Sequence, residues 1–293
     1  MVLRLFNAGL RLGALGMKLI LMLYMGKYLG LSDLGTYGLV AAYVAIAIPL
    51  LGFRVDYVAS RDVVDLPNFE LAVKMRDQIV LYAFTYLVLV LVSLVVFVLF
   101  PDLFGFKILL VTIGLAILES IATITSGNLV SLKKPILANA LFFVRSAAWI
   151  IPAVLLGFFF PIFRSAETIF SFWFVGVSLS LAVTAWVWRR LPWKEVLNTP
   201  VDWEWIKVST KKCIPIWVGA VMNLGRSFVG ISSFYGSFVV AISALLSSGV
   251  FAFGYPQLIS AHRINDNDLF DKLSKKMGIQ ATISATFISV AIG

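Results

Sequence analysis

The sequence predicts an all-α, polytopic membrane protein of about nine transmembrane helices. Hydrophobic residues make up 60% of its 293 residues and charged residues only 13%, whereas soluble domains carry roughly 45–50% apolar and about 25% charged residues. Apolar stretches of about 20 residues, the length that crosses a bilayer core, recur along the chain between short charged loops. No polar stretch is long enough to form a separate soluble domain, so we expect lipid to surround most of the chain.

We expect the nine spans at residues 5–29, 36–57, 79–100, 106–128, 137–160, 167–188, 213–234, 237–259 and 277–293. Arg11 and Lys18 interrupt the first apolar run and no small-residue cleavage site is evident, so this run is expected to be a retained helix rather than a signal peptide. The spans divide the chain into a six-helix lobe at 1–190, a cytoplasmic connection at 191–212 and three helices at 213–293. Between spans two and three, the segment LPNFELAVKMRDQ mixes apolar and charged residues, which predicts a short helix lying on the membrane.

The distribution of basic residues predicts a cytoplasmic N-terminus. Of the 24 Lys and Arg residues, five lie deeper in or near the spans, and three, Lys27, Lys107 and Arg164, lie at span ends or in a loop on the side opposite the N-terminus. The other sixteen lie on the N-terminal side. Cytoplasmic loops carry an excess of Lys and Arg, so the long basic loops are expected inside.

Seven charged residues remain in or near the predicted spans, where a charge is costly and normally faces the bundle interior, a partner or water. They are the basic residues Arg11, Lys18, Arg54, Arg145 and Arg226 and the acidic residues Asp56 and Glu119. Arg11 and Lys18 are seven residues apart and therefore share one face of the first span. We predict that the five basic side chains line a cationic central cavity, with Glu119 and Asp56 as counter-ions or coupling groups.

Several of these residues have a structural interpretation as well. Arg11 and Arg54 are near enough to span ends to extend toward the membrane surface. Asp56 can pair with Arg54 or Arg61, and Glu119 can serve as the counter-ion of either Arg145 or Lys18. Because five cations outnumber two anions, a cavity with net positive charge would suit an anionic substrate such as a pyrophosphate, whose oxygens accept charge-assisted hydrogen bonds from Arg.

Motifs for catalysis, metal binding and nucleotide binding are missing from the sequence. There is no Walker A pattern, HExxH, GxSxG or glycine-rich dinucleotide turn. The single cysteine, Cys213, and single histidine, His262, exclude a disulfide framework and a His-rich or Cys-rich metal site. We therefore predict a membrane transporter rather than an enzyme, without a cofactor or metal. The net charge of +9 is explained by the cytoplasmic loops rather than by nucleic-acid binding.

Three stretches carry recognisable motifs. The first, LILMLYMGKYLGLSDLGTYGLVAAYVAIAIPLLGFRVDYVASRDV, has a Leu-Gly pair followed by a Gly-Tyr turn between spans one and two, then a glycine at the end of span two and an Arg soon after it; these residues are Leu29, Gly30, Gly35, Tyr37, Gly38, Gly52 and Arg61. The other two are KKCIPIWVGAVMNLGRSFVGISSFYG and GYPQLISAHRINDNDLFDKLSKKM. Together they resemble the polysaccharide-export proteins of the multidrug/oligosaccharidyl-lipid/polysaccharide flippase superfamily, the second stretch being similar to the opening of the family's second half and the third to a later cytoplasmic connection. The sequence departs from the family at Arg226, near which many relatives carry an acidic residue, and in the short connection that follows.

The resemblance implies a two-lobe transporter that works by alternating access. Its expected substrate is an undecaprenyl-pyrophosphate-linked oligosaccharide, such as an O-antigen unit, moved from the cytoplasmic to the periplasmic leaflet of the bacterial inner membrane. Membrane lipids, a polysaccharide polymerase and chain-length proteins are the expected partners. Against the family's two lobes, residues 213–293 correspond to half of the second lobe, so we expect the chain to be part of a longer transporter.

The sequence leaves three other functions open. A peptidoglycan-precursor flippase would also need a cationic cavity. A drug antiporter of the same superfamily would be expected to carry a carboxylate in span one, where this chain has Arg11 and Lys18. A non-transporting scaffold for polysaccharide assembly would tolerate neutralisation of all the buried cations.

Overall fold

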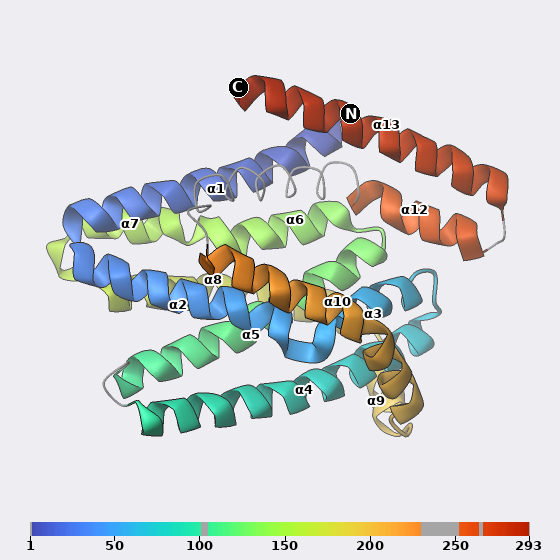
Figure 1. Cartoon of the computed structure of the whole chain (residues 1–293), viewed down its shortest axis with the longest axis horizontal. Helices are drawn as coiled ribbons and strands as arrows, with labels where there is room; N and C mark the ends of the chain where they lie inside the picture. The colour runs from blue at the N-terminus through green and yellow to red at the C-terminus, as the bar shows by residue number, and fades with distance from the viewer. Residues whose placement is uncertain (1, 101–104, 230–251, 264–265, 293) are drawn as a thin grey trace.

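The structure, a computed structural model, describes residues 2–100, 105–229, 252–263 and 266–292. Its elements in these ranges are helices, with no strand, and the main helices run roughly parallel or antiparallel to one another in an elongated bundle (Figure 1). In lipid the backbone must satisfy its own hydrogen bonds, which helices do within a single segment. The all-α prediction is confirmed for the described residues.

Six helical stretches are long and apolar enough to cross a membrane: Asn7–Tyr28, Leu31–Arg54, Asn68–Leu99, Phe106–Ser131, Pro135–Phe159 and Ala166–Trp188. They belong in turn to α1 (Val2–Tyr28), α2 (Leu31–Leu50) with the short η1 (Leu51–Arg54), α4 (Asn68–Leu99), α5 (Phe106–Ser131), α6 (Pro135–Phe143) with α7 (Ile150–Phe159), and α8 (Ala166–Trp188). These stretches match the first six predicted spans. The division into lobes at residue 190 stays a prediction.

The remaining elements lie at the bundle ends or follow α8. They are α3 (Asp56–Asp62), η3 (Pro161–Phe163), α9 (Trp193–Leu197), α10 (Trp203–Val229), α12 (Ala252–Arg263) and α13 (Asn267–Ile292). The predicted seventh span falls largely in α10, the eighth lies mostly outside the described residues, and the ninth falls in α13. The count of nine spans therefore stays a prediction.

Residues 68–78 form the first three turns of α4 rather than a separate helix on the membrane surface. Neither Pro nor Gly follows Pro67 until the helix has ended, so nothing breaks the backbone between the charged turns and the apolar span. Met75, Asp77 and Gln78 are buried in these turns. The mixed composition thus reflects packing at the bundle end, where α4 meets α9, and the predicted interfacial helix is wrong.

A backbone break ends α2 near the predicted inner surface. Gly52, Phe53 and Arg54 all have positive φ, at 65°, 51° and 60°. A Cβ at position 52 would overlap the Tyr82 ring on α4, so only glycine allows both this φ and this close packing. The break lets α3 begin at Asp56 in a new direction and places Phe53 5.5 Å, between ring centroids, from Trp217 of α10.

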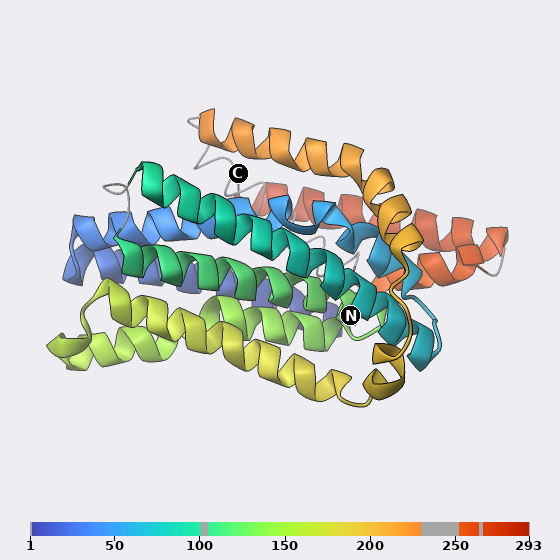
Figure 2. The same ribbon diagram turned by 90° about the horizontal axis from the view of Figure 1, so that it is seen from below.

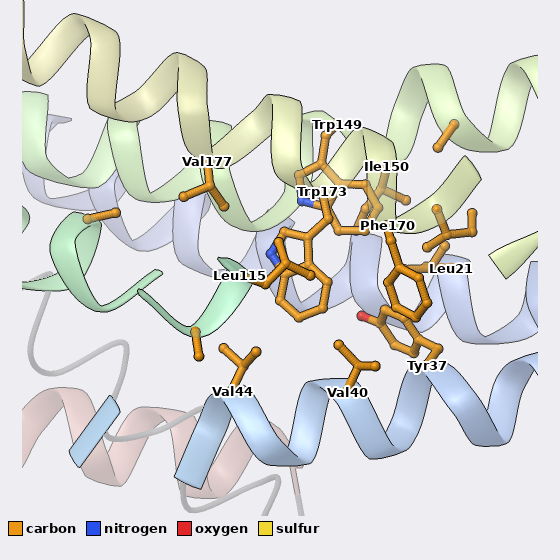
Figure 3. Close-up of a cluster of buried hydrophobic side chains, with 14 of the residues drawn as sticks. Leu21, Tyr37, Val40, Val44, Leu115, Trp149, Ile150, Phe170, Trp173 and Val177 are labelled. Carbon is orange, nitrogen blue, oxygen red and sulfur yellow. The ribbon is translucent and has the colours of Figure 1, made fainter. Parts of the chain in front are cut away.

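The apolar core lies where α1, α2, α5, α7 and α8 meet, and Figure 3 shows its central residues. The indoles of Trp149 and Trp173 stack with centroids 6.0 Å apart and an interplanar angle of 7°. Gly176 of α8 lies against Trp149, at a position where a Cβ would come within 2.6 Å of the indole. The outer faces are apolar as well: on α4, for example, Leu87, Leu91 and Val95 are more than half exposed, which is the pattern expected of helices that face lipid.

Candidate functional site: a buried ion pair beside the cationic face of α1

Glu119 and Arg145 form an ion pair inside the six-helix bundle. Nη1 of Arg145 donates to Oε2 of Glu119 at 2.7 Å, and the two residues are 8% and 6% exposed. The same Nη1 also lies 3.1 Å from the backbone oxygen of Glu119 and 2.9 Å from Oγ1 of Thr123. Of the two counter-ion roles left open for Glu119, the structure shows direct pairing with Arg145.

The aromatic core holds this pair in place. Nε1 of Trp173 donates to Oε1 of Glu119 at 2.8 Å, and Nε1 of Trp149 donates to the carbonyl oxygen of Arg145 at 2.9 Å. Arg145 lies in η2 (Val144–Ala148), a π-helical turn that joins α6 to α7. Such turns are rare and often lie at functional sites, and here the carbonyl oxygen of Arg145 within the turn accepts from the Trp149 indole. Both carboxylate oxygens of Glu119 are thus occupied, each by a donor from a different helix.

Arg11 lies beside the pair without touching Glu119. Its Nε donates to Oδ1 of buried Asn139 at 3.1 Å, and its guanidinium lies 3.8 Å from the centroid of the Phe142 ring. The guanidinium of Arg145 lies 5.4 Å from the same centroid. Phe142 therefore contacts both guanidinium groups, an arrangement in which the ring quadrupole stabilises the cations.

Lys18 is exposed although it lies in the middle of the first spanning stretch. It shares one stripe of α1 with Ala14, Leu21 and Met25, all of which are buried. Although the residue is exposed, surrounding protein atoms desolvate its ammonium, which also lies near enough to Glu119 and Arg145 to interact with both electrostatically. No direct ion pair joins it to Glu119 among the described contacts. An exposed lysine at this depth needs water, an anion or a further protein segment beside it, because lipid is a poor environment for a cation.

The remaining predicted site residues lie elsewhere. Arg54 and Asp56 flank the break after α2, with Nε of Arg54 3.6 Å from Oδ1 of Asp56, and Tyr82 donates to the same carboxylate oxygen at 3.3 Å. Arg226 lies in α10, but its side chain is outside the described residues. The structure thus brings together Arg11, Lys18, Glu119 and Arg145, and places Arg54 with Asp56 near the bundle end.

Sequence reasoning missed a buried clamp formed by Arg76. Its guanidinium pairs with Asp77, which is fully buried, at 2.6 Å. It also donates to the carbonyl oxygens of Val196, Thr199 and Pro200 at 2.8, 2.5 and 2.8 Å. This side chain therefore fixes the segment after α9, which leads into α10, against α4. The adjacent Arg-Asp pair was the one sequence signal, and it resembled ordinary loop charges.

The turn after α3 holds α12 in a similar way. Arg263 donates to the carbonyl oxygens of Arg61, Asp62 and Val64. Asp65 accepts from Lys133 at 2.7 Å and from the hydroxyl of Ser260. These two hydrogen bonds lower the pKa of the Asp65 carboxyl below its ordinary value. Residues 61–65 thus join α12 to the end of the six-helix bundle.

Within the described residues, no group of three or more His, Cys, Asp or Glu side chains is placed to hold a metal ion. Comparisons of the chain with protein-family models, with curated proteins and with solved structures find no match. The chain's own charges and the resemblance of its sequence are therefore what point to a function.

Proposed function

We propose that this protein is a flippase that moves an undecaprenyl-pyrophosphate-linked oligosaccharide, such as an O-antigen unit, across the bacterial inner membrane. The observation that carries the proposal is the exposed Lys18, midway along a membrane-spanning stretch and close to a buried ion pair. A cation held there must meet a polar or anionic partner within the membrane. A pyrophosphate headgroup supplies negative charge at that depth when it passes α1.

The charge balance around Lys18 favours an anionic substrate over a cationic drug. Glu119 is already bonded by Arg145 and Trp173, so its charge is largely compensated. Arg11 and Lys18 then remain on α1 without a carboxylate in direct contact among the described ion pairs. Two such cations would repel a cationic substrate and attract a phosphate.

The proposed orientation places the N-terminus in the cytoplasm. The long basic loops then face inward, as the distribution of Lys and Arg requires. In this orientation Arg11 lies nearer the cytoplasmic surface and Lys18 deeper, so the two cations would meet the headgroup in succession. A polysaccharide polymerase and chain-length proteins would act on the product in the periplasmic leaflet.

The test is complementation of a strain that lacks its own O-unit flippase, read out as surface polymer. We expect Lys18→Ala to reduce export strongly and Lys18→Arg to restore much of it, because arginine keeps the charge. Lys27→Ala is the matched control, since Lys27 is an exposed lysine at the end of the same helix. Immunoblots of the membrane fraction would show that all variants insert equally.

Normal export by Lys18→Ala would overturn the cationic transport mechanism, whereas failure of the wild-type protein to restore export would overturn the proposed transport and favour the scaffold alternative. Rescue of a peptidoglycan-flippase depletion strain, without rescue of O-unit export, would instead favour the alternative lipid-linked substrate.

A further inference from the structure

Three membrane-spanning helices, α4, α5 and α8, enclose a groove of about 500 Å³ on the side of the bundle away from α1. Figure 2 shows the three helices in the order α4, α5, α8. Each contributes one stripe of side chains at helical spacing, and the lining residues are Met75, Gln78, Ile79, Tyr82, Ala83 and Tyr86 from α4, Ile121, Ile124, Thr125 and Asn128 from α5, and Leu181, Thr184, Ala185 and Trp188 from α8. Each stripe ends near the bundle end that carries α9.

The dimensions of the groove suit one hydrocarbon chain. From Met75 to Tyr86 its α4 wall rises about 16 Å, close to half of the ~30 Å hydrocarbon core of a bilayer. Its walls are mainly aliphatic and aromatic, and Ala83 and Ala185 in the lining are exposed. The groove therefore spans about one leaflet and opens beside small side chains.

Two buried donors in the lining have no acceptor. Gln78 is 2% exposed; its Oε1 accepts from Nδ2 of Asn128 at 3.1 Å, but its Nε2 has no hydrogen-bond partner among the described residues. Nε1 of Trp188 is also buried and has no hydrogen-bond partner among the described residues. By contrast, the hydroxyls of Thr125 and Thr184 are bonded to backbone oxygens. Unpaired buried N–H groups at the inner end of a groove favour an occupant with acceptor oxygens.

The rim at this end is cationic. Arg189 and Arg190 directly follow Trp188, Lys194 lies four residues further on, and all three are exposed. They take part in none of the ion pairs that the structure describes. Tryptophans at positions 186, 188 and 193 surround them, as expected at the headgroup level of a membrane.

We propose that the groove binds an anionic glycerophospholipid of the leaflet beside α9, with one acyl chain along α5. Its ester and phosphate oxygens accept from Gln78 and Trp188, and its negative charge faces the rim formed by Arg189, Arg190 and Lys194. Basic sites between membrane helices on the cytoplasmic side suit such headgroups. The groove does not contain Lys18 or the Glu119–Arg145 pair, so this proposal stands independently of the proposed transport.

The test is native mass spectrometry of the full chain, delipidated in mild detergent and titrated with phosphatidylglycerol or with phosphatidylcholine of the same acyl chains. We expect wild-type protein to bind one phosphatidylglycerol at least about tenfold more tightly than phosphatidylcholine. Ala185→Trp fills the groove and should abolish this preference. Ala182→Trp, at an exposed position of α8 outside the groove, is the matched control and should keep it.

Two further variants make the result decisive. Ala83→Trp fills the groove from α4 and replaces Ala185→Trp if the latter fails to fold, as judged by its thermal midpoint. Replacing both Arg189 and Arg190 with Gln should bring phosphatidylglycerol binding close to that of phosphatidylcholine. Equal affinity of the wild type for the two lipids, or unchanged binding in both folded groove-filling variants, would overturn the proposal.

Discussion

The buried ion pair between Glu119 and Arg145 should contribute strongly to stability only while both partners are present. Arg145→Met removes the cation from a carboxylate that is 8% exposed and that then keeps, among the described side chains, only the hydrogen bond from Trp173. Glu119→Gln leaves a 6% exposed guanidinium without its counter-ion. Breaking a buried pair from one side typically costs about 3–5 kcal/mol, because the remaining charge is uncompensated. Each single variant should therefore lose stability of this order.

The double variant Glu119→Gln, Arg145→Met should recover much of that loss. Glutamine keeps an oxygen for the Trp173 indole, and methionine fills most of the volume of arginine without a charge. Replacing a buried ion pair by uncharged groups of similar volume often changes the stability little. We expect the cost of the double variant to fall at least about 2 kcal/mol short of the sum of the single costs, which is the coupling energy that a double-mutant cycle measures.

The assay is reversible unfolding in mixed micelles of mild detergent and SDS, followed by tryptophan fluorescence. Trp149 and Trp173, two of the eight tryptophans, contact the pair directly, so part of the signal reports on its surroundings. The control cycle uses Lys107 and Glu167, which are paired at 2.6 Å but are more than 70% exposed; their coupling should not exceed about 1 kcal/mol. Additive costs at Glu119 and Arg145 would refute the pairing and return Arg145 to the set of free cavity cations.

Three further outcomes follow from the bundle end. A non-glycine residue in the left-handed conformation costs roughly 1–2 kcal/mol. Gly52→Ala should destabilise the protein by more than this, since the new methyl group also meets the Tyr82 ring. The same unfolding assay measures the loss, and a neutral result would contradict the break after α2. Arg76→Ala should speed trypsin cleavage at the already exposed Lys194 while leaving α1 protected, because the segment between α9 and α10 loses its hydrogen bonds to α4; an unchanged cleavage rate would contradict the clamp. The folded-state pKa of Asp65 is lowered, so the stability contributed by its carboxylate is complete at pH values above the ordinary carboxyl pKa and is lost as the pH falls through the folded-state pKa. Thermal midpoints of wild type and Asp65→Asn should therefore differ at pH 7 and converge at low pH. A difference that stays constant with pH would exclude this role.

The first six spans could be predicted because lipid imposes a length and a composition on each crossing helix. The ends of those helices could not be placed by the same rule. The first three turns of α4 are charged, yet they continue the helix since neither Pro nor Gly interrupts them. The break after α2 depends on Gly52 meeting Tyr82, a contact between residues 30 positions apart that hydropathy does not encode.

The charged residues of the site could be found from sequence, but their partners could not. A charged side chain deep within a membrane span is energetically costly, and this marked four residues as candidate functional residues: Arg11, Lys18, Glu119 and Arg145. Charge alone could not decide whether Glu119 would pair with Arg145 or Lys18, because both are cations at comparable depth. The choice depends on the π-helical turn at Arg145 and on the position of Trp173, which are properties of the packed bundle.

The ion pairs change which residues can supply uncompensated positive charge inside the bundle. Five cations were expected to line a cavity, but Arg145 is neutralised by Glu119, and Arg54 has Asp56 within 3.6 Å. Among the predicted residues whose side chains are described, Arg11 and Lys18 are left without a carboxylate in direct contact. Both lie on α1, on one face and seven residues apart. Selectivity for an anionic substrate should therefore depend on α1 far more than on η2, so Lys18→Ala should impair export at full stability, whereas Arg145→Met should impair export in step with its lost stability.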